Sequence, residues 1–382
     1  MKAWPKATLG ELLRRPDEVT TLDAAAEYHE VTIKLWGKGV VSRGRVRGSD
    51  VVSARRVVRA NQLILSKIDA RNGAIGLVPP ELDGAIVSND FPSFEFRDPE
   101  RCNAAFMGWL VRSAPFVELC KAASEGTTNR VRIKEDRFLD QQIGLPPLSE
   151  QQAIVVRLDA LAETTREVEA LLDAVERDAD HLLALRFRDA IADAPLRAMA
   201  EVAPAVRRSV EIDIATRYRE VGARSFGKGL FVKPDFDGAE ATWQKPVWIR
   251  SGDLVLSNIK AWEGAIAVAG EEHDDCIASH RYITCVPDPT LATTGFLAYY
   301  LLSEDGLEKV GLASPGTADR NRTLSLGNLG KIEVPVPELA AQQTFDRLHA
   351  DVAALKAKHA AIRQANAALL PATLERLFGG SA

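Results

Sequence analysis

Two loops of this sequence carry cationic and aromatic side chains beside glycines, a combination suited to contacting a nucleic acid. The segment 36–39 reads Trp-Gly-Lys-Gly, and the segment 226–229 reads Phe-Gly-Lys-Gly. A lysine between glycines lies on a flexible loop, where backbone amides can also approach a phosphate. The two loops are therefore candidate DNA contacts, although solvated turns would have the same composition.

The two loops belong to an internal repeat whose matching blocks are about 190 residues apart. Four blocks occur twice, in the same order and at a nearly constant offset. They begin at Tyr28 and Tyr218, Leu63 and Leu254, Ile86 and Ile277, and Gly126 and Gly316. Each block is weak alone, but four in order indicate a duplicated domain rather than a solenoid.

The two copies share glycines and aliphatic residues, whereas their polar residues differ. This contrast predicts one scaffold with two specificities. Block four carries a repeated pair of arginines, and arginine forks suit both phosphate oxygens and guanine edges. The alternative is that shared polar residues cap turns or pair with carboxylates. The candidate DNA contacts are Lys34, Trp36, Lys38, Lys67, Arg71, Asn72, Asn89, Arg130 and Arg132 in the first copy, and Arg224, Phe226, Lys228, Asn258, Lys260, Trp262, His280, Arg320 and Arg322 in the second.

Two segments with helical periodicity, residues 148–193 and 338–382, must position these loops. Each follows a proline-rich, strand-like run, and Ser149 is the predicted N-cap of the first. Apolar residues recur in steps of three and four, which is the pattern of a coiled-coil seam. The predicted seam comprises Leu158, Leu161, Val168, Leu172, Val175 and Leu182 in the first segment, and Phe345, Leu348, Val352, Leu355, Ile362 and Leu369 in the second.

The equal length and common period of the two helices predict that they pack on each other. His359 and Asn366 occupy seam positions, where buried polar residues help to fix register. Pro371 is expected to kink or interrupt the second helix. The alternative is that each helix packs only on its own domain. A helix of ~40 residues is ~60 Å long, more than one turn of B-DNA.

Catalytic motifs are not apparent in the sequence. The segment 222–229 nearly matches a phosphate-binding loop, but Gly229 replaces the hydroxyl residue that would hold magnesium. No histidine pair has metal-ligand spacing, and no nucleophile elbow is present. The acidic pair Asp274-Asp275 lacks a lysine at nuclease-like spacing. We therefore expect no catalytic residue, no metal site and no bound cofactor in this chain.

Composition is that of an ordinary globular protein of 382 residues, 46% hydrophobic and 26% charged. Net charge is −5, but the acidic excess is concentrated in residues 150–193, which carry 5 Lys+Arg against 11 Asp+Glu. No apolar run suggests a signal peptide or a membrane span, so we expect a cytoplasmic protein. The four cysteines match no zinc or redox spacing and are expected to be reduced thiols: Cys102, Cys120, Cys276 and Cys285.

This architecture resembles the specificity subunits of type I restriction-modification systems over essentially the whole chain. The segments that carry the resemblance are 64–75, 223–229 and 145–152, the last reading Leu-Pro-Pro-Leu-Ser-Glu-Gln-Gln. The resemblance implies an α+β fold with two mixed α/β target-recognition domains in a pseudo-twofold tandem repeat. The domains, residues 1–147 and 194–337, would be joined by long helices, 148–193 and 338–382, that form an antiparallel coiled coil.

The same resemblance implies a function. Each domain would read one half of a split double-stranded DNA target, and the helices would set the gap and dock two methyltransferase subunits. Two motor-nuclease subunits are optional further partners, and S-adenosylmethionine, ATP and Mg would bind only to partner subunits. The chain departs from the family pattern at Ala340-Ala341, where the second helix entry lacks a Ser-Glu pair. Two alternatives are a coiled-coil scaffold without a DNA role and the recognition half of a single-chain restriction-methylation enzyme.

Overall fold

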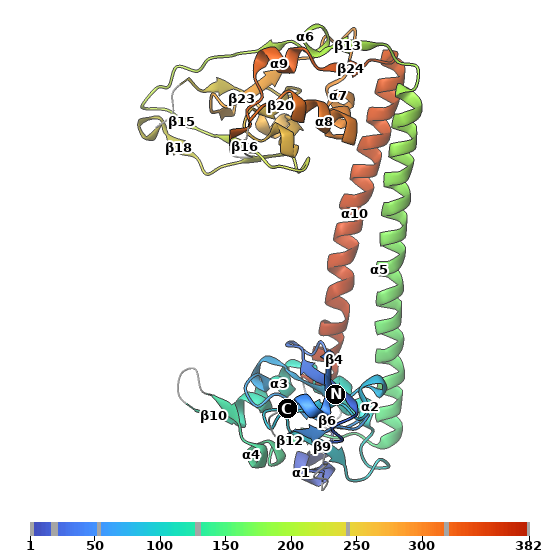
Figure 1. Ribbon diagram of the computed structural model, residues 1–382. Helices are drawn as coiled ribbons and strands as arrows, with labels where there is room; N and C mark the ends of the chain where they lie inside the picture. The colour runs from blue at the N-terminus through green and yellow to red at the C-terminus, as the bar shows by residue number, and fades with distance from the viewer. Residues whose placement is uncertain are drawn as a thin grey trace. The chain divides into compact units, whose positions relative to one another are not determined.

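The computed structural model describes residues 4–16, 22–51, 55–126, 131–241, 245–316 and 321–379. The chain divides into two compact units, Met1–Asp173 with His359–Ala382 (unit 1) and Ala174–Lys358 (unit 2). Each unit combines one globular repeat with one stretch of each long helix (Figure 1). The mixed helix-and-sheet class predicted from the sequence is confirmed.

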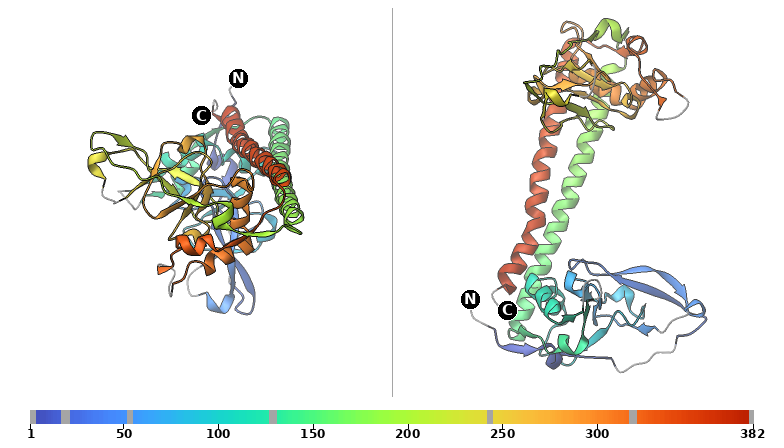
Figure 2. Two further views of the ribbon diagram at one scale, coloured as in Figure 1. Left: turned by 90° about the horizontal axis from the view of Figure 1, so that it is seen from above. Right: turned by 90° about the vertical axis from the view of Figure 1, so that its left-hand side faces the viewer.

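Unit 1 is built around a four-stranded sheet of order β2-β9-β6-β7 and a second sheet of order β4-β3-β8-β5. Its strands are β1 Lys6–Thr8, β2 Leu13–Arg14, β3 Glu27–Ile33, β4 Val40–Arg47, β5 Arg56–Val57, β6 Leu63–Leu65, β7 Ile75–Leu77, β8 Ile86–Val87, β9 Ser93–Phe96, β10 Ser124–Glu125, β11 Arg132–Ile133 and β12 Gln142–Gly144. Its short helices are α1 Leu9–Leu12, α2 Ala104–Leu110, α3 Ala114–Ala122 and α4 Glu135–Leu139. The β3–β4 hairpin, in blue, extends away from the rest of the unit (Figure 2, right).

Unit 2 repeats this plan with a four-stranded sheet of order β14-β23-β20-β21. Its strands are β13 Leu196–Ala198, β14 Ala205–Val206, β15 Arg217–Tyr218, β16 Val221–Ala223, β17 Leu230–Val232, β18 Phe236–Asp237, β19 Val247–Trp248, β20 Leu254–Ser257, β21 Ile266–Val268, β22 Ile277–Ala278, β23 Tyr282–Cys285 and β24 Glu333–Pro335. Its short helices are α6 Met199–Val202, α7 Thr294–Leu302, α8 Glu304–Leu312 and α9 Leu326–Gly330. Leu63 pairs with Phe94 as Leu254 pairs with Cys285, so the register is repeated too.

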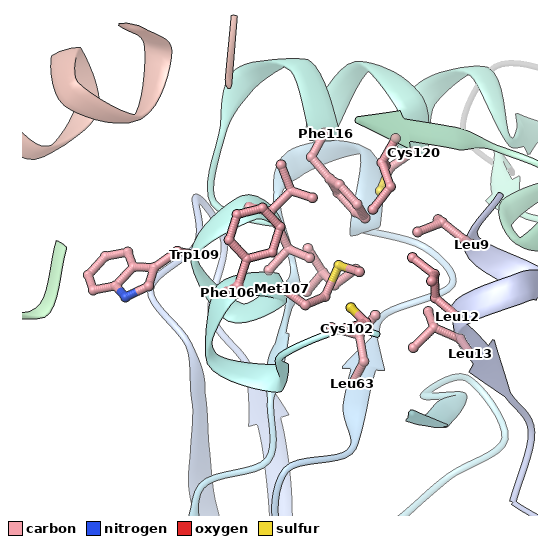
Figure 3. Close-up of a cluster of buried hydrophobic side chains, with 14 of the residues drawn as sticks. Leu9, Leu12, Leu13, Leu63, Cys102, Phe106, Met107, Trp109, Phe116 and Cys120 are labelled. Atoms are coloured by element: carbon pink, nitrogen blue, oxygen red, sulfur yellow. The ribbon is translucent and has the colours of Figure 1, made fainter. Parts of the chain in front are cut away.

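The core of unit 1 lies between its central sheet, α2 and α3. Phe106, Met107 and Phe116 are almost fully buried there (Figure 3). All four cysteines are buried free thiols. Burial raises the pKa of Cys102, Cys120 and Cys285 to about 12 and also raises the pKa of Cys276. These thiols are neutral side chains of the two cores.

The two long helices are α5, Leu148–Ile191, and α10, Leu339–Phe378. Helix α5 begins one residue before the predicted cap Ser149, because the backbone N–H of Gln151 donates to the carbonyl of Pro147. The sequence predicts that Pro371 kinks or interrupts the second helix, and the interruption is wrong, since α10 continues through it. An interior proline removes one hydrogen bond of the helix, and α10 nevertheless remains helical on both sides of Pro371.

The helices pair antiparallel within each unit. In unit 1, Arg363 donates to Asp173 at 2.8 Å, and the Asn366 amide donates to the carbonyl of Thr165 at 3.0 Å. In unit 2, Lys356 pairs with Asp180 at 2.6 Å. Residue numbers rise along α10 as they fall along α5, as an antiparallel pair requires. The prediction that the helices pack on each other is confirmed, and the buried Asn366 makes a cross-helix contact.

The seam between the helices drifts away from the predicted seven-residue repeat. Leu158, Leu172 and Val352 are buried, but four predicted seam residues are 41–49% exposed: Val175, Leu182, Ile362 and Leu369. The residues buried instead along α5 and α10 include Leu183, Phe187, Leu374 and Phe378. An α-helix with 3.6 residues per turn drifts by about 20° per heptad, so a strict 3.5-residue repeat places the later positions one residue too early. Leu161, Val168, Leu348 and Leu355 are partly buried.

The first glutamine of each Gln-Gln pair fastens a long helix to its globular repeat. Gln151 is fully buried; its amide donates to the carbonyls of Arg101 and Pro146 at 3.0 and 2.8 Å and accepts the N–H of Asn103. Gln342 repeats all three hydrogen bonds, with Leu291, Pro337 and Thr293. The second helix entry therefore keeps the anchoring residue although it lacks the Ser-Glu pair.

Candidate nucleic-acid interface

The tip of the β3–β4 hairpin displays an aromatic side chain on a fixed backbone. Trp36 is 72% exposed and has a φ of 60°, a region that bulky residues rarely adopt. The N–H of Trp36 donates to the carbonyl of Asn72 at 3.0 Å, and the N–H of Gly37 donates to that of Gly73 at 3.0 Å. These hydrogen bonds join blocks one and two of the repeat and hold the tip in place.

Unit 2 has the same tip between β16 and β17. Phe226 is 75% exposed with a φ of 63°, and its N–H donates to the carbonyl of Glu263 at 2.8 Å. The N–H of Gly227 donates to the carbonyl of Gly264 at 2.9 Å. A Cβ at Gly264 would come within 3.3 Å of the backbone of Phe226, which explains why this glycine is shared with Gly73.

The strain and exposure at these tips indicate a function for the tips rather than a contribution to stability. A left-handed non-glycine residue costs about 1–3 kcal/mol, and such residues concentrate at binding sites. An exposed indole or phenyl ring is not buried in the free chain and therefore contributes no hydrophobic stabilisation to it. Both copies keep the left-handed backbone and the exposed ring, so the aromatic tip is a repeated structural feature of this chain.

Cations surround both tips. Lys34 and Lys38 are exposed beside Trp36. At the other tip, the Lys228 ammonium lies 5.8 Å from the centre of the Phe226 ring. Arg224 is exposed, and its guanidinium lies 4.6 Å from the centre of the Phe231 ring. The predicted loop residues therefore gather at the tips and can meet a phosphate backbone and a base together.

Blocks two, three and four of unit 1 meet at a separate place, beside the end of β6. The carbonyl of Lys67 accepts the N–H of Ile133 at 2.8 Å. The ammonium of Lys67 lies 2.8 Å from Glu135, and the guanidinium of Arg132 lies 2.8 Å from Asp90. Both predicted DNA contacts are thus engaged by carboxylates that the sequence interpretation missed.

The corresponding place in unit 2 reveals a shift in the repeat. The carbonyl of Asn258 accepts the N–H of Leu324 at 2.7 Å, as Lys67 accepts that of Ile133. This pairing makes Thr323, not Arg322, the positional counterpart of Arg132. The predicted recurrence of Arg132 as Arg322 is therefore wrong, because the offset after the block-four loop is 191 residues rather than 190.

Arg322 instead contributes to a stacked cluster around Trp262. Its guanidinium lies 4.7 Å from the centre of the Trp262 ring and donates to the carbonyls of Ser314 and Gly311. Lys260 lies 5.2 Å from the centre of the same ring and 2.6 Å from a Glu263 oxygen. The hydrogen bond from Lys260 lowers the pKa of Glu263. These contacts support the turn that holds Phe226.

The remaining predicted contacts divide into three groups. Asn89 and His280 are exposed at equivalent ends of the two repeats. Arg71 is partly buried, and Asn72 donates weakly to Asp69 at 3.4 Å. Arg130 and Arg320 lie outside the described residues.

Among the residues that the structure describes, no group of three or more His, Cys, Asp and Glu side chains could hold a metal ion, and no helix is long and apolar enough to cross a membrane.

These features, two repeated globular units with a long helix leading from each, define a class of tandem-repeat α+β chains with two long helices. No protein-family model and no curated protein sequence matches this chain. Its fold matches the crystal structure of the HsdS subunit from Thermoanaerobacter tengcongensis, with a TM-score of 0.64 and 24% identity, covering 100% of this chain and 97% of that one. It also matches a chain from a structure on complex assembly and conformational transition of the type I R-M system, with a TM-score of 0.67 and 24% identity, covering 100% and 98%. The fold implied by the resemblance is confirmed.

Proposed function

We propose that this chain is the DNA-reading, non-catalytic subunit of a cytoplasmic type I restriction-modification complex. Each globular repeat reads one half of a bipartite double-stranded DNA target. The observation that carries the proposal is the pair of hairpin tips, each with a strained, exposed aromatic residue, Trp36 or Phe226, among cations. The fold it shares with an HsdS subunit supports the same role.

The polar residues where blocks two and four meet support two different half-sites. Lys67 and Arg132 of unit 1 are replaced in position by Asn258 and Thr323 of unit 2, while the backbone hydrogen bonds between blocks two and four are kept. Cations and amides present different hydrogen-bonding patterns to base edges. The two repeats would therefore prefer different sequences, and the helices would set the gap between them.

Exposed apolar residues on the long helices support docking of partner subunits. Val156 and Leu171 on α5 are 68% and 65% exposed, and Ile362 and Leu369 on α10 are 46% and 49% exposed. Contiguous apolar surface marks protein interfaces, whereas apolar residues exposed singly are common on any protein. We propose that two methyltransferase subunits cover these faces and bind S-adenosylmethionine. Two motor-nuclease subunits with ATP and Mg would be further members of a complex that also cleaves.

The test is a methylome. The chain is co-expressed with its cognate methyltransferase subunit in a host without adenine methylation, and modified adenines are mapped by single-molecule sequencing. We expect a split motif with two defined halves around an unspecified gap. Exchanging residues 194–337 for those of another such chain should change one half only. An intact complex with a cofactor-competent methyltransferase and no motif would refute the proposal and favour a scaffold role.

A further inference from the structure

Unit 1 contains a three-residue ion-pair cluster at the meeting point of blocks two and four. Glu135, at the start of α4, accepts from Lys67 at 2.8 Å and from Arg15 at 2.9 Å. Arg15 also pairs with Asp136 at 2.8 Å. The side chains of Lys67 and Glu135 are only 26% and 20% exposed, so this cluster fills the space beside β6.

In unit 2, all three positions hold uncharged residues. Asn258 replaces Lys67, as the shared backbone hydrogen bonds establish. Leu326 begins α9 as Glu135 begins α4, and Ala205 follows α6 at the same spacing as Arg15 follows α1. The three replacements line one cavity of about 340 Å³. Its volume is within the range of about 300–1,000 Å³ seen for ligand sites.

The other side chains around this cavity can donate or accept hydrogen bonds. His280, Thr323 and Ser325 are exposed at its rim. Tyr282 lines it too, and its hydroxyl oxygen accepts the N–H of Ala223 at 3.1 Å. Among the residues that the structure describes, no carboxylate lines the cavity, and the one lining arginine, Arg207, donates to the carbonyl of Lys245.

Asn258 has unused hydrogen-bonding capacity. Its Oδ1 is buried without a hydrogen-bond partner among the described residues. Buried polar atoms are rarely left unpaired, since each costs about 1–3 kcal/mol. Asn258 lines a cavity whose described lining, apart from Arg207, contains no Lys, Asp or Glu, and such a lining suits a heterocycle better than a phosphate. An asparagine amide matches the N6 and N7 positions of adenine.

We infer that this cavity is the base-reading site of the second domain and takes the hydrogen-bonding edge of an adenine through Asn258. The inference rests on the proposed function. At the equivalent three positions the first domain holds the ion pairs of Lys67 and Arg15 with Glu135. The second domain would therefore read this base through the Asn258 amide, at a place where the first domain holds the ion-paired Lys67 and Glu135.

The test uses the full chain with its methyltransferase subunit and compares the methylome of Asn258→Ala, Asn258→Asp and the wild type. We expect N258A to reduce the preference for adenine at one position of the second half-site by on the order of tenfold or more. Aspartate only accepts, so N258D should move that preference toward cytosine, whose N4 amino group donates. The first half-site should be unchanged in both variants, which serves as the internal control.

A further variant rebuilds the cluster of unit 1 in unit 2, as A205R/N258K/L326E. It should keep the thermal stability of the wild type within a few degrees and lose the same adenine preference, because the cavity is filled. A wild-type motif that persists unchanged in folded N258A and in the rebuilt variant would overturn the inference alone. A wild-type complex that methylates no split motif would overturn the proposed function as well.

Discussion

The side-chain oxygen of Gln151 accepts the backbone N–H of Asn103 at 2.8 Å, which ties the first turn of α5 to the start of α2. Asn103 is itself the N-cap of α2, where its side chain accepts from Phe106. One buried amide thus links a long helix to the globular repeat that it serves.

Gln151→Leu should destabilise unit 1 strongly. The change leaves one N–H and two carbonyls without partners, and each buried unpaired group costs about 1–3 kcal/mol. We expect a loss of about 3 kcal/mol or more in the free energy of unfolding, measured by urea denaturation. Gln152→Leu is the matched control, because Gln152 is exposed. Equal stability of the two variants would contradict the anchoring role.

Replacing the aromatic residue at a hairpin tip should separate stability from function. Trp36→Gly relieves a left-handed backbone and should raise the free energy of unfolding by about 0.5–1 kcal/mol. It should also weaken DNA binding by the assembled complex, since base stacking is worth about 1–3 kcal/mol per base. Leu35→Ala, one residue earlier, is the control. Undiminished affinity in W36G would remove the ring from the interface.

The lysines at the hairpin tips should contribute to the salt dependence of DNA binding. Each lysine that neutralises a phosphate contributes about 0.9 to the steepness of log K against log salt. Lys38→Ala and Lys228→Ala are therefore each expected to flatten this slope by about that amount and to weaken binding to all sequences alike. Lys121→Ala, an exposed lysine paired with Glu118 on α3, should leave the slope unchanged. A change of specificity instead of slope would identify base contacts.

The drift of the seam predicts opposite behaviour for neighbouring leucines. Leu183 is 4% exposed and Leu182 is 41% exposed. Leu183→Ala should cost about 2–5 kcal/mol in the free energy of unfolding, and Leu182→Ala much less than that. Chemical denaturation of the two variants measures both. A larger loss in the free energy of unfolding for L182A than for L183A would contradict the drift of the seam and favour the seven-residue repeat predicted from the sequence.

The buried thiols should make the chain sensitive to alkaline pH. Burial raises the pKa of Cys102, Cys120 and Cys285 to about 12, whereas an unfolded thiol ionises near pH 9. The stabilisation is complete below pH 9 and is lost as the pH rises from 9 to 12, by about 1.4 kcal/mol per pH unit and thiol. Urea denaturation between pH 8 and pH 10.5 measures this loss. Cys120→Ala should reduce the pH dependence of the free energy of unfolding by the contribution of one thiol.

The duplicated fold and its two long helices could be predicted because repetition and periodicity are visible in a single sequence. Whether a side chain at a predicted site is unpaired could not be predicted, because its ion-pair partner can lie far away in the sequence. Lys67 looked like a DNA contact until Glu135, 68 residues later, proved to be its partner. The positional counterpart of Arg132 was misassigned, since one residue inserted in a loop leaves no mark in a pattern of similar residues.

Among the described residues, the side chains of Gln151 and Gln342 form their hydrogen bonds with main-chain atoms alone. Main-chain amides and carbonyls are the same whatever side chains the domain carries. A joint of this kind tolerates replacement of an entire domain by one of unrelated sequence, provided that the backbone path is kept. Under the proposed function, genetic recombination between relatives would therefore give the chain a new half-site in one step, without any adjustment of the helices.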